Sequence, residues 1–412
     1  MNRIVLIGNG FDLAHGLKTS YADFINWYWD QRVEHFVYEH SLVSEDVLCT
    51  FESINKDRWH WHVWYLYSFQ SYYRQGATGK DIVDAIIKDG ENFKVSFSPF
   101  FERINKSIET KGWVDIENEY YELLTKYALK EKSAEKVNEL NTQLHFLQDK
   151  LVEYLSEVTI KKDEVKSGIK KKIYSPFKQT DISVERGYAL QEHLEKGLRL
   201  DDRGWAIKLF QYDRHNPFCK MEIEEYKKKV ENKERELKPD DTIVEFLLPD
   251  QIMLLDFNYT QTAQMYYIEK PGFTINHIHG VIERPQSVIF GYGDELDERY
   301  KELLNQNDNT LLNNIKSVKY LESNNYRKVL SFIEAEPYQI LIMGHSCGNS
   351  DRTLLNTLFE HKNCVSIKPY FYKRDEETDN YLELIQNISR NFTDMKLMRD
   401  RVVNKTYCEP LT

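Results

Sequence analysis

The sequence has few cysteines, and none of them forms a C-x-x-C pair. The five are far apart, at Cys49, Cys219, Cys347, Cys364 and Cys408. This scatter argues against a zinc ribbon or a thioredoxin-type site and favours reduced thiols. The sequence also lacks any run of about 18 apolar residues, which argues against a transmembrane helix. Because strand-like sequence begins at residue 2, we expect no signal peptide and a cytoplasmic protein.

The sequence has fewer basic residues than acidic ones. The chain has 55 Lys and Arg against 66 Asp and Glu, a formal net charge of -11 at pH 7. A general binder of nucleic acid or of a membrane surface needs a basic face, so this balance disfavours both functions and leaves room only for a local basic groove. Aromatic residues, in contrast, make up 13% of the chain and can each bury a large area. The 412 residues suffice for one large core and a second lobe.

The N-terminal stretch has the pattern of a buried strand that runs into a glycine turn. The apolar residues 4–7 lead into Gly8-Asn9-Gly10, and a helical pattern follows. Parallel α/β folds begin a nucleotide site in this way, because glycines admit a phosphate and the helix start offers N–H groups. The third glycine of the dinucleotide fingerprint is absent, since Ala14 and His15 precede Gly16. A tight strand–helix turn without a ligand is therefore the alternative.

The middle of the chain has a different pattern, and we predict that residues 16–245 form a helical insertion. Within it, the stretches at about 129–172 and 219–238 are highly charged, with apolar residues three or four apart in the first, which predicts long helices. The aromatic stretch 59–73 favours buried helix packing over a platform for nucleic-acid bases. Asp115 is the predicted N-cap of a further helix.

Strand-like runs return in the C-terminal part, at 252–257, 273–278, 288–290, 338–343 and 365–372. Helical patterns lie between most of them, at 260–269, 296–304, 311–334, 350–361 and 376–390. This alternation predicts an α/β fold with a mainly parallel, Rossmann-like sheet that is flanked by helices on both faces. We predict that residues 1–15 and 246–412 together form this nucleotide-binding domain.

Polar motifs stand at the predicted strand ends, where parallel sheets bind their ligands. The amide of Asn258 can hold a ribose hydroxyl or a water, and a turn asparagine is the alternative. His279 precedes a glycine and titrates near neutral pH, which suits acid–base catalysis. A buried, hydrogen-bonded histidine is the alternative, and it is favoured for His277. The loop from Gly344 to Asp351 leads to a helix start that either binds phosphate or ribose or is simply capped.

No metal site is predicted. His277 and His279 share one face of a strand, but a divalent metal needs a third ligand, and no carboxylate is near them in sequence. Asp115 and Glu117 are two residues apart on a predicted helix, so they do not share a face and are weak candidates for paired acid–base work.

Residues 7–24, Ile-Gly-Asn-Gly-Phe-Asp-Leu-Ala-His-Gly-Leu-Lys-Thr-Ser-Tyr-Ala-Asp-Phe, resemble the signature of the AbiH-type bacteriophage abortive-infection proteins. The Trp-Val-Asp-Ile-Glu run at 113–117 does so too, and the resemblance extends from residue 2 to about 375. The later motifs resemble the wider sirtuin-like superfamily of nucleotide-binding domains. There, a Gly-rich first loop, an Asn-Tyr-Asp strand end, a His-Gly strand end and a late Gly-x-Ser loop surround NAD, and some defence proteins of that superfamily hydrolyse it.

The resemblance implies two catalytic residues. Asn258 would contact the nicotinamide ribose or position water, and His279 would be the general base. The implied cofactor-binding residues follow the strand ends: Gly8, Asn9, Gly10, Phe11, Asp12, Thr260, Gly344, Ser346 and Asp351. The sequence departs from the superfamily at Thr260, where an aspartate is usual, and this departure puts NAD cleavage in question. It also lacks the zinc-binding cysteines of the protein deacylases, which argues against a deacylase.

The leading hypothesis is therefore an antiphage abortive-infection protein that binds NAD or a related nucleotide and hydrolyses it, with release of nicotinamide, when triggered. The alternative is a non-catalytic nucleotide-binding sensor that recognises a phage component. An RNA-directed toxin is a weaker third hypothesis, because the chain is acidic and shows no clustered acidic metal site. The expected partners are the nucleotide, a phage protein or nucleic-acid trigger, and a second copy or a partner defence protein bound through the helical insertion, but no membrane.

Overall fold

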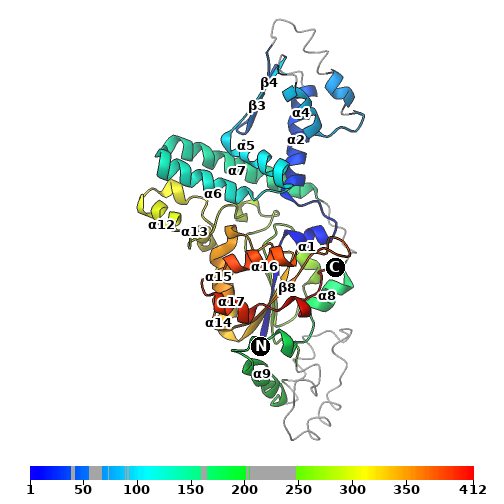
Figure 1. The fold of residues 1–412 in the computed structure, drawn as a ribbon, viewed down its shortest axis with the longest axis vertical. Helices are drawn as coiled ribbons and strands as arrows, with labels where there is room; N and C mark the ends of the chain where they lie inside the picture. The colour runs from blue at the N-terminus through cyan, green and yellow to red at the C-terminus, as the bar shows by residue number, and fades with distance from the viewer. Residues whose placement is uncertain are drawn as a thin grey trace. The chain divides into compact units, whose positions relative to one another are not determined.

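The computed structural model describes residues 1–38, 42–54, 67–72, 74–88, 90, 92–158, 165–200, 204 and 247–412. The chain forms two compact units (Figure 1). The first unit contains Met1–Leu17, Ile160–Ile289 and Ser317–Thr412, and the second contains Lys18–Thr159 and Phe290–Lys316. The predicted helix at 219–238 and most of the aromatic stretch 59–73 lie outside the described residues, although 67–72 are helical.

The first unit is built on a five-stranded sheet with the strand order β6-β5-β1-β7-β8. The strands are β1 (Asn2–Ile7), β5 (Ile252–Asp256), β6 (Phe273–His277), β7 (Tyr338–Met343) and β8 (Cys364–Tyr370). Every neighbouring pair is parallel, so the predicted α/β class with a mainly parallel sheet is confirmed. The central strands β5, β1 and β7 form here because their near-continuous apolar runs suit a sheet that is buried on both faces.

The helices of this unit connect the strands and cover the sheet. They are α1 (Asn9–Ala14), α8 (Ser167–Ile173), α9 (Tyr188–Leu198), α14 (Asn325–Ala335), α15 (Arg352–Glu360), α16 (Tyr381–Arg390) and α17 (Met395–Arg401). Short 3-10 turns lie at η2 (Gln179–Asp181), η5 (Thr262–Tyr266), η6 (Pro285–Ser287), η8 (Tyr320–Glu322), η9 (Asn349–Asp351) and η10 (Lys405–Tyr407). The helix predicted at 260–269 is thus only the turn η5. The predicted strand 288–290 is unpaired, and the Ile289 N–H donates to the His279 carbonyl instead.

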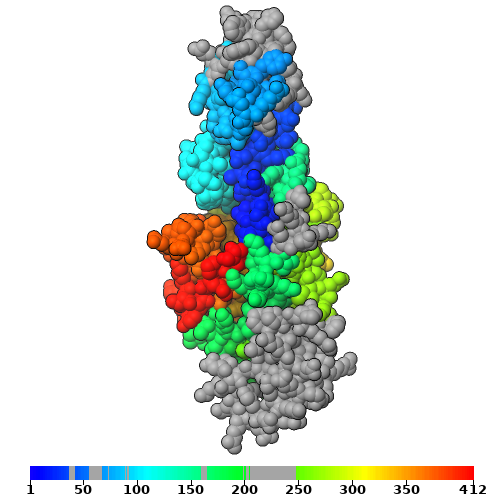
Figure 2. Space-filling model, turned by 90° about the vertical axis from the view of Figure 1, so that its right-hand side faces the viewer, coloured from blue at the N-terminus to red at the C-terminus, as the bar shows by residue number. Residues whose placement is uncertain are grey.

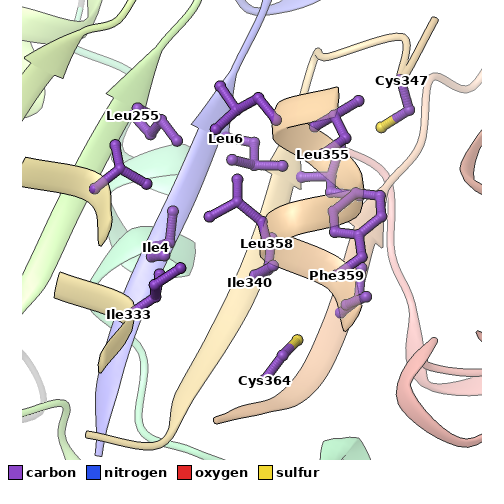
Figure 3. Packing of buried hydrophobic residues seen from close by; sticks show 14 of the residues in the cluster. Ile4, Leu6, Leu255, Ile333, Ile340, Cys347, Leu355, Leu358, Phe359 and Cys364 are labelled. Atoms are coloured by element: carbon purple, nitrogen blue, oxygen red, sulfur yellow. The ribbon is translucent and has the colours of Figure 1, made fainter. Parts of the chain in front are cut away.

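The alternation of side chains along β1 divides the core between the two faces of the sheet. Ile4 and Leu6 belong to one apolar cluster, which includes residues of α14, α15 and α16. Figure 3 shows Leu6 near Leu355 and Leu358 of α15, and Ile4 near Ile333 of α14. Val5 and Ile7 belong to the cluster on the other face, with residues of α8 and η5. Each fully buried Leu or Ile contributes about 2 kcal/mol, so these clusters hold the strand ends in place.

The C-terminal residues pack beside α8. Lys172 donates hydrogen bonds from Nζ to the carbonyls of Pro410 and Leu411, at 2.6 and 2.9 Å. Figure 2 shows the two segments, green and red, next to one another on the surface of the first unit. None of the helices in the described ranges is long and apolar enough to cross a membrane.

The second unit combines helices with a small sheet. Its helices are α2 (Tyr21–Tyr38), α4 (Gly79–Lys88), α5 (Pro99–Lys111), α6 (Ile116–Thr125), α7 (Ala134–Glu157) and α12 (Glu298–Asn305), with the π-helix η1 (Lys126–Glu131) and the turn η7 (Asn309–Leu312). The helix α13 (Lys316–Lys319) begins at the last residue of this unit. Strands β2 (Val43–Glu45), β3 (Cys49–Ser53) and β4 (Phe93–Phe97) form an antiparallel sheet.

Two features of this unit differ from the sequence prediction. The small sheet was not predicted, because strands of three to five residues give too short a pattern to stand out from helical neighbours. The predicted long helix at 129–172 is represented by η1, α7 and α8 in the described residues, and α7 has 24 residues.

The predicted N-cap Asp115 is confirmed, since its side chain accepts the Asn118 N–H at 3.0 Å. The predicted insertion runs from 16 to 245, whereas compactness divides the chain at Leu17, Thr159, Ile289 and Lys316.

Candidate functional site

Four strand ends of the first unit meet at one edge of its sheet. Ile7 of β1 pairs with Asp256 of β5 and with Met343 of β7, and Asp256 pairs in turn with His277 of β6. Because all four strands are parallel and end in register, the segments that follow them lie at the same edge. The predicted site residues come from these segments, the first of which is more than 240 residues from the other three in sequence.

Asp12 and Thr260 are in direct contact at this edge. The Thr260 hydroxyl donates to Oδ2 of Asp12 at 2.5 Å, and the Asn258 amide donates to the Gly8 carbonyl at 3.1 Å. Burial raises the pKa of Asp12 to about 6, against the lowering effect of the Thr260 hydrogen bond. The other oxygen, Oδ1, is buried and has no hydrogen-bond partner among the described residues. A carboxyl group therefore lies against Thr260, although it comes from the segment after β1.

A second buried carboxyl, that of Asp256, contacts the backbone of Asn258. Its Oδ1 accepts the Asn258 N–H at 3.0 Å, and its Oδ2 lies 3.2 Å from Nδ1 of His277. Burial raises the pKa of Asp256 above its usual range, and the neighbouring His277 opposes this effect. Sequence reasoning missed Asp256, yet a carboxylate at the end of the apolar run Met253–Leu255 is a recognisable signal.

His279 belongs to a group of four titratable side chains, together with Asp351, His345 and Tyr320. Its Nε2 lies 3.3 Å from Oδ1 of Asp351, while Oδ2 of Asp351 lies 3.5 Å from Nε2 of His345. The Tyr320 hydroxyl lies 3.1 Å from Nε2 of His279. All four side chains are buried or nearly so. Asp351 was predicted to contact a nucleotide, whereas His345 and Tyr320 were missed. For His345, the signal is a titratable residue directly after a strand-ending glycine.

The glycines of the first and last motifs pack backbone against backbone. The Gly10 N–H donates to the Gly344 carbonyl at 2.8 Å, and the Phe11 N–H donates to the Gly8 carbonyl at 2.8 Å. A Cβ on Gly8 would lie 2.6 Å from the Cα of His345, and Gly344 has a φ of 76°. The close contact between the two loops explains why glycine is needed at these positions. The N–H groups of Gly10 and Phe11, at the start of α1, already have hydrogen-bond partners. That the first turn binds phosphate stays a prediction.

The remaining predicted residues lie in different surroundings. Phe11 is fully buried and packs its ring against His15 and Tyr266, at centroid distances of 4.8 and 5.3 Å, so it is part of the core. Asn9 and Ser346 are exposed, and the Ser346 carbonyl accepts a hydrogen bond from the Asn387 amide at 2.9 Å. These two can meet a ligand without any rearrangement of the core.

The arrangement is suited to proton transfer and to hydrogen bonding of a polar ligand. It combines three histidines and three carboxyls with one amide at the edge of a buried sheet, where the low dielectric strengthens each interaction. In the part of the chain that the structure describes, no group of three or more His, Cys, Asp or Glu residues is placed to hold a metal ion.

A comparison with protein families adds an independent finding. The model of the bacteriophage abortive infection family AbiH matches residues 4–373, which include all the strand ends of the site. No curated protein and no solved structure matches the chain. Since the family match spans most of both compact units, the chain belongs to the bacteriophage abortive infection family AbiH.

Proposed function

We propose that this AbiH protein binds NAD or a related nucleotide at the carboxyl edge of the first unit's sheet and hydrolyses the bond between ribose and nicotinamide. Membership in the family indicates a role in abortive phage infection, and depletion of NAD is a way to arrest an infected cell. The observation that supports the chemistry is the convergence of Asn258, His279 and Asp351 at one edge, from three different strands.

The proposed reaction needs little more than a placed water and one base. The water oxygen bonds to the anomeric carbon, and the bond from that carbon to the nicotinamide nitrogen breaks. Its electron pair goes to the ring, which leaves as neutral nicotinamide, and the water proton passes to His279. The amide of Asn258 holds the water or a ribose hydroxyl. Orientation of this kind can supply several kcal/mol of the barrier reduction.

The contacts at the strand ends refine the proposed roles of the predicted binding residues. Asp351 faces His279, so it supports the base, and contact with the second half of the nucleotide is left to Gly344 and Ser346. The carboxyl of Asp12 lies beside Thr260, the residue that stands where the superfamily has an aspartate. The departure at Thr260 is therefore compatible with catalysis.

Nicotinamide release from NAD by the purified full chain tests this proposal. The assay is run with the protein alone and with an extract of phage-infected cells, because the trigger has to be supplied. We expect release by the wild type, and a drop of about a hundredfold or more for His279→Ala and for Asn258→Ala. His361→Ala is the matched control, since that histidine contacts Glu334 away from the site. Equal background rates for the wild type and His279→Ala would refute hydrolysis.

One observation favours the non-catalytic alternative, a nucleotide-binding sensor. Thr260 stands where the superfamily has an aspartate, and such a site can bind the nucleotide without turning it over. Thermal unfolding with NAD and with ADP-ribose separates the two functions. Stabilisation by both nucleotides without any product favours the sensor, and the absence of both stabilisation and product rejects a nucleotide site altogether.

A further inference from the structure

The carboxylate of Asp351 bridges two histidines. One oxygen lies 3.3 Å from Nε2 of His279, and the other lies 3.5 Å from Nε2 of His345. The three residues come from the end of β6, the loop after β7 and the turn before α15, so only the fold brings them together. Sequence motifs account for His279, but nothing so far accounts for His345.

The structure assigns the tautomer of His345. The backbone N–H of Cys347 donates to its Nδ1 at 3.0 Å, so Nδ1 is an acceptor. A neutral imidazole that accepts at Nδ1 carries its proton on Nε2, and this nitrogen faces Asp351. His345 therefore donates toward Oδ2 of the carboxylate and leaves Oδ1 for His279.

The loop that carries His345 is held in a strained form. Cys347 has a φ of 55°, a left-handed conformation that is uncommon for a residue with a side chain. Asn391, which directly follows α16, donates from its amide to the Cys347 carbonyl at 2.9 Å, and Asn387 within α16 does so to the Ser346 carbonyl at 2.9 Å. This anchoring fixes the N–H of Cys347, which in turn fixes the ring of His345.

Aromatic packing fixes both imidazoles further. The ring of Phe257 meets His279 and His345 edge-on, with centroid distances of 5.2 and 4.2 Å. Tyr320 stacks parallel to His279 at 6.1 Å and places its hydroxyl near Nε2. The ring of Tyr259 lies 6.4 Å from that of His279. The charged or titratable groups around His279 are thus Asp351, His345 and these two tyrosines.

We propose that His345 and Asp351 are positioning residues for His279 in the hydrolysis, an inference that rests on the proposed function. His345 orients the carboxylate, and the carboxylate receives the N–H at Nε2 of His279. The proton taken from water then arrives at Nδ1, and the negative charge of Asp351 balances the imidazolium that forms. After nicotinamide has left, the same proton passes from His279 to solvent.

Histidine NMR of the free full-length protein tests the geometry without any substrate. We expect His345 to be the Nε2–H tautomer in the wild type. Asp351→Asn removes the adjacent negative charge and lowers the pKa of His279 by about one unit. Glu334→Gln is the matched control, because it removes a carboxylate beside another histidine, His361, and leaves the pKa of His279 unchanged. An Nδ1–H tautomer of His345, or an unchanged pKa of His279 in Asp351→Asn, would overturn the inference.

The pH profile of nicotinamide release tests the catalytic consequence. With a lower pKa of the base, the acidic limb in Asp351→Asn moves down by about one pH unit, and kcat falls more than KM changes. His345→Gln keeps an N–H donor toward Asp351 and retains most of the rate, whereas His345→Phe keeps the ring volume and loses it. Equal rates for these two variants would overturn the role of His345.

The two experiments separate the two claims. Nicotinamide release with a wild-type pH profile in Asp351→Asn overturns the positioning role and leaves the proposed function intact. If no variant and no wild-type sample releases nicotinamide, the proposed function fails, whereas the NMR result still decides whether Asp351 and His345 control His279. Thermal unfolding of each variant shows whether it is folded.

Discussion

Glu117 in the second unit and Asp12 in the first unit are both buried carboxyl groups, and their hydrogen-bonding surroundings differ. In the second unit, Glu117 of α6 pairs with Lys316 at 2.9 Å, and its other oxygen accepts the Gly291 N–H at 3.1 Å. In the first unit, one oxygen of Asp12 accepts the Thr260 hydroxyl, and the other has no hydrogen-bond partner in the described ranges. Asp12 and Lys316 are each only 1% exposed.

The difference indicates that the charge of Glu117 is structural, whereas the carboxyl of Asp12 is available for chemistry. A buried pair with both oxygens satisfied offsets the loss of hydration and fixes the elements that carry it. A buried carboxyl with an unpartnered oxygen and a pKa raised to about 6 weakens the fold and is typical of functional sites. The position agrees with this contrast, because Asp12 lies at the carboxyl edge of a parallel sheet.

The largest effect is expected in the second unit. Lys316→Met leaves Glu117 buried without its counter-charge and lowers the free energy of unfolding by about 3 to 5 kcal/mol. Urea denaturation of the full chain measures this loss. The double variant Glu117→Leu with Lys316→Met should regain most of it, since no charge is left buried. A single variant as stable as the wild type would show that the pair is not structural.

An intermediate effect, of opposite sign, is expected for Asp12. Its folded-state pKa of about 6 lies above the unfolded value, so ionisation weakens the fold as the pH rises from about 4 through 6. Asp12→Asn resembles the protonated acid and removes this dependence. Its stability relative to the wild type should therefore grow by about 2 kcal/mol between pH 4 and pH 7.

Urea denaturation at the two pH values measures this difference for Asp12→Asn. Asp81→Asn in the second unit is the control of the opposite sign, because hydrogen bonds from Thr78 lower the pKa of that exposed carboxyl. A pH-independent difference between Asp12→Asn and the wild type would show that the two buried carboxyls are not treated differently.

The smallest effect sharpens the comparison within the second unit. Tyr120 donates its hydroxyl to Asn141 at 2.6 Å, whereas the buried hydroxyl of its neighbour Tyr121 has no partner among the residues that the structure describes. Tyr120→Phe should lower the free energy of unfolding by about 1 kcal/mol, and Tyr121→Phe should leave it unchanged or raise it slightly. Thermal unfolding compares the two directly, and equal losses would assign Tyr121 an unseen partner.

Much of the first unit follows from local pattern. The runs at 252–257, 273–278 and 338–343 form the strands that were predicted. The first and the last are mainly apolar and buried throughout, as central strands of a covered parallel sheet are, whereas the edge strand β6 mixes apolar and polar residues. The strand predicted at 288–290 was wrong, because a run of three apolar residues is equally compatible with a segment that pairs with no other strand. The sheet β2-β3-β4 escaped prediction because its pairing partners are up to about fifty residues apart and its strands are short.

In the candidate site, too, local pattern selected some residues but could not show their contacts. Residue type and position at a strand end selected Asn258 and His279 as candidates, each beside a structural alternative, and the family resemblance added Asp12. Pattern gave no means to tell that Asp351 faces His279, or that Gly344 packs on Gly10, since both contacts join segments more than seventy residues apart.

The sequence by itself determined the strands, the glycine turns and the family, because these depend on the order and type of neighbouring residues. Only the tertiary structure decided which polar groups became partners. The parallel register of β1, β5, β6 and β7 brings four distant segments to one edge. Burial at that edge then raises the pKa of Asp12, and Asp351 comes to lie between His279 and His345. Desolvation and charge proximity are properties of a site in three dimensions, and no stretch of sequence contains them.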